Sequence, residues 1–144
     1  MTSRPDGRIV VGVDGSRLSR AAVRWAVRLA ALTGGPLEAV AVWEFPLPQD
    51  EHGTVPPPLD GFESERHAAR ILDETLAAAL SPGTAVRRLL PAGLPGPTLV
   101  AAARGATALV VGSRGRSAPP GAPLGSVALH CVDRAPCTVV VVRE

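Results

Sequence analysis

Two short segments of this chain combine glycines with polar side chains in patterns that suit a phosphorylated ligand. The first is Gly-Val-Asp-Gly-Ser at residues 12–16. The second is Gly-Ser-Arg-Gly-Arg-Ser at residues 112–117, which leads to a Gly-Ser pair at residues 125–126. Each follows a continuous apolar run of the kind that forms a buried strand.

The second segment suits an anion for several physical reasons. Its glycines let the backbone approach a ligand closely and turn with positive φ, and successive N–H groups in such a turn form an anion-binding nest. Ser126 is expected at a helix N-terminus, where unpaired N–H groups and the dipole favour negative charge. Arg114 and Arg116 can add charge-assisted hydrogen bonds. Asp14 has the wrong sign for phosphate and suits ribose hydroxyls, or a metal ion that accompanies the phosphates.

The composition excludes several other kinds of chemistry. All 15 basic residues are arginine, which rules out a Walker-type P-loop and a lysine Schiff base. The net charge of +2 is small and the arginines are dispersed, so we expect no nucleic acid partner. The histidines are scattered and Cys131 and Cys137 match no zinc or redox spacing; we expect buried thiols and no protein-built metal site. Ser126 matches no nucleophile elbow, and we find no catalytic constellation.

Strand and helix patterns alternate along the chain, and 144 residues suit one domain over residues 1–144. Strands are predicted at residues 8–13, 37–45, 85–90, 107–112 and 138–142. Helices are predicted between a cap at Ser16 or Ser19 and the stop at 34–36, and at about 61–80, 95–104 and 126–134. This alternation predicts an α/β fold with an open five-stranded parallel sheet, helices on both faces and right-handed crossovers.

Other features of the sequence leave alternatives open. The proline-rich segment at about 46–59 is expected to form an extended loop, either a lid over the site or a passive surface loop. Trp25 has core spacing on its helix, whereas Trp43 suits either the core or an adenine pocket. No apolar run approaches the ~18 residues that cross a bilayer, so we expect a cytoplasmic protein without a membrane partner.

The two glycine segments are expected to meet at one site. In open α/β sheets, ligands bind beyond the carboxyl ends of the strands where the strand order reverses. If the first and fourth strands are neighbours, the loop after residue 12 faces the loop after residue 112.

The spacing of the glycines resembles a known nucleotide motif. Gly112-Ser-Arg-Gly115, nine residues and then Gly125-Ser126 are similar to the G-x-x-G, nine residues, G-[S/T] pattern of the universal stress protein family. The opening Ile-Val-Val-Gly-Val-Asp-Gly-Ser at 9–16 and the final Pro-Cys-Thr-Val-Val-Val-Val at 136–142 also resemble that family. The resemblance covers essentially the whole chain.

The resemblance implies a Rossmann-like sheet of the adenine-nucleotide α-hydrolase type, with strand order 3-2-1-4-5, and ATP as ligand. It implies that Asp14 contacts the ribose or metal region, with Mg²⁺ held only indirectly through the nucleotide, and that backbone near Val42 meets the adenine. The residues expected to bind the nucleotide are Gly12, Asp14, Val42, Gly112, Ser113, Arg114, Gly115, Arg116, Ser117, Gly125, Ser126 and Val127. It also implies a homodimer through the strand at 138–142.

Three functions follow, in order of preference. The first is a regulatory ATP-binding module in a stress response, whose bound nucleotide biases a dimer or a protein partner. The second is a family member without ATP that acts through protein interactions, because Pro119, Pro120 and Pro123 lack N–H donors in the glycine loop. The third is an ATP-hydrolysing or adenylating enzyme, ranked last because residues 14–16 lack the glycine pair of the S-G-G-x-D-S pattern of the related hydrolases.

Overall fold

The computed structural model describes residues 4–45, 61–116, 118 and 120–143. The proline-rich segment predicted at 46–59 lies outside the described residues, as do Ser117 and Pro119. The strands are β1 (Ile9–Gly12), β2 (Leu37–Val40), β3 (Arg87–Leu89), β4 (Ala108–Gly112) and β5 (Thr138–Val142). The helices are α1 (Arg17–Thr33), α2 (Gly61–Ala79), α3 (Pro95–Ala102) and α4 (Ser126–Arg134).

The strands form one parallel sheet in the order β3-β2-β1-β4-β5, which confirms the predicted architecture. β1 lies at the centre, with Ile9 opposite both Leu37 of β2 and Ala108 of β4. All four residues of β1 are buried, as a strand covered on both faces requires. Successive strands are added on one side of β1 up to β3 and on its other side from β4 onward. The strand order therefore reverses between β1 and β4, where a ligand site is expected.

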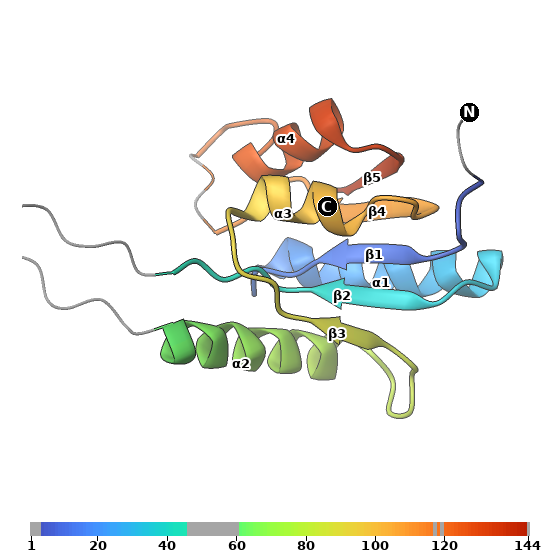
Figure 1. Ribbon diagram of the computed structural model, residues 1–144, viewed down its shortest axis with the longest axis horizontal. Coiled ribbons are helices and arrows are strands. Elements are labelled where there is room, and N and C mark those ends of the chain that lie inside the picture. Colours follow the sequence, from blue (N-terminus) through green and yellow to red (C-terminus); the bar gives the residue numbers. More distant parts are fainter. Residues whose placement is uncertain (1–3, 46–60, 117, 119, 144) are drawn as a thin grey trace, which may run out of the picture.

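Helices cover both faces of the sheet (Figure 1). α1 and α2 pack on one face around Val11, Leu72 and Val110, and α3 and α4 pack on the other around Val10 and Leu109. Alternate residues of β1 and β4 therefore enter different cores, which explains why these two strands are continuously apolar. No helix in the described part of the chain is both long and apolar enough to span a bilayer.

The helix ends follow the predicted capping signals. Ser16 caps α1, and its side chain accepts a hydrogen bond from the Ser19 N–H at 3.2 Å. Gly34 ends α1 in the left-handed region with φ 71°. The prediction that Trp25 belongs to the core is wrong: it is 47% exposed and stacks with Arg28, because the buried stripe of α1 runs through Ala22, Val23 and Ala26 instead.

β2 is shorter than the predicted strand at residues 37–45. It ends at Val40, and beyond it Trp43 forms only an isolated bridge with Ala92. The ladder with β3 breaks off because Pro91 has no N–H to donate, although its carbonyl still accepts from the Trp43 N–H at 3.2 Å. Val42 consequently lies just past the end of β2, at the edge where the loops converge.

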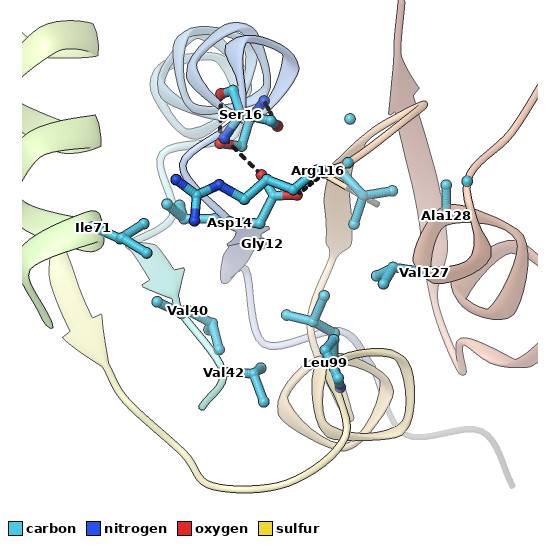
Figure 2. Close-up of a pocket in the computed structure, with 18 of the residues that line it drawn as sticks. Gly12, Asp14, Ser16, Val40, Val42, Ile71, Leu99, Arg116, Val127 and Ala128 are labelled. Atoms are coloured by element: carbon cyan, nitrogen blue, oxygen red, sulfur yellow. Dashed lines mark hydrogen bonds between the residues drawn. The ribbon is translucent and has the colours of Figure 1, made fainter. Parts of the chain in front are cut away.

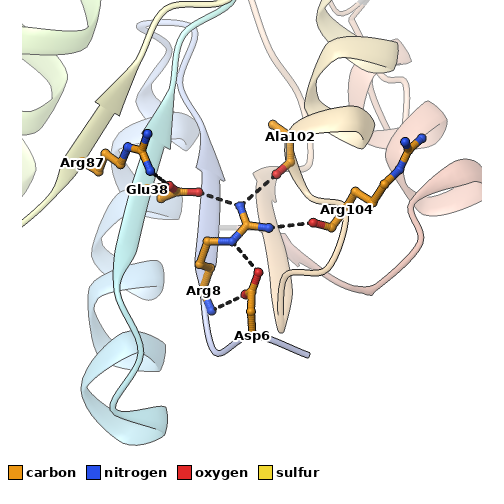
Figure 3. A network of polar contacts seen from close by, with 6 residues as sticks. All are labelled: Asp6, Arg8, Glu38, Arg87, Ala102 and Arg104. Atoms are coloured by element: carbon orange, nitrogen blue, oxygen red, sulfur yellow. Dashed lines mark hydrogen bonds and ion pairs between the residues drawn. The ribbon is translucent and has the colours of Figure 1, made fainter. Parts of the chain in front are cut away.

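Arg8 ties together the opposite, amino-terminal edge of the sheet (Figure 3). Its Nη1 donates to Glu38 Oε1 at 2.7 Å and to the Ala102 carbonyl at 3.1 Å, its Nη2 donates to the Arg104 carbonyl at 2.6 Å, and its Nε donates to Asp6 Oδ2 at 2.7 Å. The guanidinium thus pairs with a carboxylate of β2 and satisfies carbonyls at the C-terminus of α3. This network holds β1, β2 and the end of α3 together, and the loops of the candidate site follow β1 and β2 at their other ends.

Candidate functional site

A cleft of about 300 Å³ lies beyond the carboxyl ends of β1, β2 and β4 (Figure 2). Residues from β1 and its loop, the end of β2, α2, α3, the glycine loop after β4 and the start of α4 line it. We call it the central cleft. Among the residues that line it are Gly12, Asp14, Val40, Val42, Ile71, Leu99, Gly115, Arg116, Gly125, Ser126 and Val127.

Asp14 joins the two glycine segments at the mouth of the central cleft. Its Oδ1 accepts a hydrogen bond from the Ser16 N–H at 2.9 Å, within its own loop. Its Oδ2 accepts one from the Arg116 N–H at 3.2 Å, from the loop after β4. The carboxylate therefore holds the two loops together, and its remaining lone pairs are able to accept from a ligand hydroxyl.

The loop glycines are required by close packing. A Cβ atom at Gly115 would collide with Asp14 Oδ2, and one at Gly12 would lie 2.8 Å from Leu99 Cδ1. A Cβ atom at Gly112 would lie 2.9 Å from Leu18 Cβ. The prediction that the motif glycines turn with positive φ is wrong: in the described residues the positive φ values near the site belong to Gly15 and Gly121.

The N-terminus of α4 faces the central cleft. Gly125 is the N-cap residue and has no side chain to accept from the first turn, so the N–H groups at Ser126 and Val127 lack that partner. The N–H of Gly125 donates to the Ser113 carbonyl at 2.7 Å, which fixes the start of the helix against the end of β4. This geometry suits an anion, because the free N–H groups and the helix dipole both favour negative charge.

One side of the central cleft is apolar. Val40, Val42, Ile71 and Leu99 extend toward it from β2, the segment after β2, α2 and α3 (Figure 2). Trp43 is not among the residues that line it; the Trp43 Nε1 donates to the Leu90 carbonyl at 2.8 Å. Of the two alternatives for Trp43, its contacts support a structural role. The apolar side of the cleft therefore suits a flat apolar group such as a nucleobase.

The structure brings most of the predicted site residues to this one cleft. Those that line it are Gly12, Asp14, Val42, Gly112, Arg114, Gly115, Arg116, Gly125, Ser126 and Val127. Ser113 is 5% exposed and is not among the lining residues; its N–H donates to the Val142 carbonyl of β5 instead. Ser117 lies outside the described residues.

Sequence reasoning missed the residues that α2 and α3 contribute. His67 and Ile71 of α2, and Pro95 and Leu99 of α3, line the central cleft. No local motif marks them, since their role depends on how each helix packs against the sheet. The only signal was the amphipathic pattern of α2, which predicts an inward face without saying which ligand lies there.

The prolines between Gly115 and Gly125 remove fewer backbone N–H donors from the central cleft than their number suggests. Pro120 and Pro123 are not among the residues that line the central cleft, whereas Ala118 is. The missing N–H groups at these two positions therefore do not face the ligand space.

Comparison with known proteins identifies the family. The model of the universal stress protein family matches residues 7–143. The chain belongs to the universal stress protein family. It is 35% identical over 138 residues to universal stress protein Rv2624c of Mycobacterium tuberculosis, an alignment that covers 94% of this chain and 48% of that protein. This universal stress protein chain thus spans about half the length of the curated relatives it matches.

Solved structures of universal stress proteins have the same fold. A family protein from Burkholderia pseudomallei is 27% identical, with a TM-score of 0.69 over 96% of both chains. The universal stress protein UspA of Lactobacillus plantarum is 24% identical, with a TM-score of 0.65 over 99% of this chain and 100% of that one. A universal stress protein solved in complex with cAMP is 28% identical, with a TM-score of 0.60 over 94% and 95% of the two chains.

Proposed function

We propose that this universal stress protein binds ATP in the central cleft and acts as a regulatory module. The observation that carries the proposal is the convergence of Asp14, the glycine loop and the N-terminus of α4 on one cleft with an apolar interior. The carboxylate suits a ribose, the anion site suits a phosphate chain, and the apolar pocket suits an adenine. A cAMP complex in a relative 28% identical supports a nucleotide as the ligand class.

The proposed arrangement follows the polarity of the cleft. The adenine lies against Val40 and Val42, and the ribose hydroxyls hydrogen-bond to Asp14. The phosphates extend to the N–H groups of Ser126 and Val127, where the helix dipole stabilises their charge. Gly115 leaves room for this path because it carries no side chain.

Magnesium is proposed to arrive with the phosphates. Mg²⁺ is commonly held by one or two carboxylates together with substrate phosphates. The described residues contain no group of three or more His, Cys, Asp or Glu side chains that could hold a metal, and Asp14 is the acidic residue among those lining the central cleft. A single carboxylate fits an ion that the nucleotide brings and does not fit a resident metal centre.

The bound state is proposed to act through a homodimer and an unidentified protein partner. β5 is one of the two edge strands of the sheet, and the Val142 carbonyl accepts from the Ser113 N–H, which follows β4. Because successive residues of a strand alternate their N–H and C=O directions, Val139 and Val141 direct these groups to the open edge. A second copy could pair there.

A cytoplasmic location stays a prediction. Cys131 and Cys137 are both free thiols, as a reducing compartment favours. Fractionation of cells followed by detection of the protein checks it.

The proposal is tested by acid extraction of freshly purified protein, followed by thermal unfolding with added ATP. We expect released adenine nucleotide, or a stabilisation by ATP of about 2.7 kcal/mol when ATP is about 100-fold above its Kd. An empty extract together with an unchanged Tm would contradict ATP binding and favour the family member that acts through proteins alone. ATP turnover that is proportional to protein and lost in Asp14→Ala would instead indicate an enzyme.

A further inference from the structure

A second, smaller hollow adjoins the central cleft. It has a volume of about 80 Å³ and is lined by Gly15, Arg20, Ile71, Glu74, Thr75 and Arg116. We call it the Arg20 hollow. It shares Ile71 and Arg116 with the central cleft, so the two spaces adjoin at these residues. Its size fits one small ion.

Arg116 belongs to this hollow as much as to the phosphate region. Figure 2 shows its side chain running from the glycine loop across Asp14 toward Ile71 of α2, away from Val127 at the start of α4. A Cβ atom built on Gly15 would lie 3.4 Å from Arg116 Nη2. Gly15 has a left-handed backbone with φ 84°, which favours glycine, and it lies beside this guanidinium.

The charge of the Arg20 hollow favours an anion. Two guanidinium groups and the Glu74 carboxylate line it, which leaves a net positive charge. Ion pairs of the described residues include those of Arg8, Arg87, Arg88 and Arg134, and the described ion pairs do not include Arg20 or Arg116. The hydrogen-bonding capacity of Arg20 and Arg116 therefore remains available to a ligand.

Two further features add donors and positive potential. Thr75 is 3% exposed and presents a hydroxyl that can donate to an oxyanion. Arg20 lies in the first turn of α1, which contains no acidic residue, so the positive end of the helix dipole is not neutralised there. Both features act in the same direction as the two guanidinium groups.

From this arrangement we infer that the Arg20 hollow is an oxyanion site that takes a phosphoryl group distinct from the 5′-phosphates in the central cleft. The phosphoryl group has two sources. Free inorganic phosphate would bind independently of the proposed nucleotide function. A phosphate carried on the ribose of a nucleotide would reach the hollow past Asp14 and Arg116, and this source rests on the proposed function.

The site is tested by titrating inorganic phosphate into the full chain and following backbone amides by two-dimensional NMR. We expect saturable shifts at Gly15, Arg20 and Thr75. Arg20→Gln should weaken this binding about ten-fold or more, because a charge-assisted hydrogen bond is lost. The matched control Arg24→Gln, one turn further along α1 and outside the hollow, should leave it unchanged.

Glu74→Gln gives a second test with the opposite sign. Removing this carboxylate should tighten phosphate binding, because the net positive charge of the hollow rises. Shifts confined to Ser126 and Val127, equal affinity in Arg20→Gln, or weaker binding in Glu74→Gln would each overturn the inference.

The source of the phosphoryl group is decided by calorimetry with AMP and adenosine 3′,5′-bisphosphate. Tighter binding of the bisphosphate, lost in Arg20→Gln, assigns the hollow to a ribose-borne phosphate. Equal affinities together with the amide shifts from inorganic phosphate assign it to the free ion. If neither nucleotide binds, the proposed function fails while the phosphate titration still decides the hollow.

Discussion

At the scale of single residues, the glycines of the second loop have different physical reasons to lack a side chain. A Cβ atom at Gly112 meets the backbone of α1, with the Leu18 carbonyl carbon at 3.1 Å, and a helix backbone cannot move aside. A Cβ atom at Gly115 meets only the carboxylate of Asp14, which can rotate away. The first glycine therefore serves the fold, and the second serves the site.

This difference predicts opposite outcomes for two alanine substitutions. Gly112→Ala should lower the free energy of unfolding by about 1–3 kcal/mol through overpacking. Gly115→Ala should lower the free energy of unfolding by at most about 1 kcal/mol, because the two hydrogen bonds that Asp14 would lose are exposed. It should weaken ATP binding about ten-fold, because the displaced Asp14 loses its proposed ribose contact. Urea unfolding and ATP calorimetry on both variants check this, and equal effects of the two substitutions would refute it.

The place of the site residues that belong to a sequence motif could be predicted from the sequence. The place of the site residues that α2 and α3 contribute could not. Asp14, Gly115 and Ser126 follow strands at fixed spacing, so their convergence could be deduced from a parallel sheet. Ile71 and Leu99 carry no local signal, because their position depends on tertiary packing.

At the scale of elements, the amino-terminal edge of the sheet depends on one buried carboxylate. Glu38 of β2 is 4% exposed, and its two oxygens accept from Arg8 at 2.7 Å and from Arg87 at 3.3 Å. The Arg87 side chain is 72% exposed, so Arg8 supplies most of the compensation. The same network lowers the pKa of Asp6, chiefly through the hydrogen bond from the Arg8 side chain.

Arg8→Met should therefore destabilise the fold by about 3 kcal/mol, because it leaves a buried charge poorly paired. The matched control is Arg134→Met, which removes an exposed pair with Asp133 and should cost less than about 1 kcal/mol. Denaturant unfolding of the two variants measures the difference. Similar losses would show that Glu38 does not depend on Arg8.

The free energy of unfolding at alkaline pH should depend on the buried thiol of Cys131 in α4. Burial raises the pKa of the Cys131 thiol to about 11, from an ordinary value of 9.0, and burial also raises the pKa of Cys137. A raised folded pKa means that the stabilisation is complete below pH 9 and is lost as the pH rises toward about 11. The chain has no lysine and no tyrosine, so few other groups titrate in this window.

Urea unfolding of the wild type between pH 8 and 11 should show a free energy of unfolding that falls by up to about 1.4 kcal/mol per pH unit for each thiol. Cys131→Ala should make this fall shallower. An unchanged slope in the variant would contradict the burial of this thiol.

Element types were predictable from periodicity and caps, but some ends and faces were not. The sequence alone does not show that Pro91, on the neighbouring strand segment, stops the ladder at the end of β2. Nor does it show that α1 turns Trp25 outward, since Trp25 lies three residues after Ala22 and next to Ala26, both of which are buried.

At the scale of the whole molecule, the open edge at β5 determines how copies can associate. A proposed homodimer would pair the outward N–H and C=O groups of Val139 and Val141 with those of a second copy. Val139→Pro removes one outward N–H without touching the bonds to β4, and it should shift the protein to monomer in light scattering. Val139→Thr keeps the N–H group and the β-branched shape and should remain dimeric. A dimeric proline variant would place the interface elsewhere.

The strand order places the loops after β1 and β4 side by side, and the proposed ligand binds between them. Calorimetric titration of ATP into the wild type and Gly115→Ala tests this most directly. The account predicts saturable, stoichiometric binding to the wild type and binding about ten-fold weaker to the variant, whose fold remains intact. No heat of binding with the wild type, or the same affinity in both proteins, would contradict a nucleotide in the central cleft.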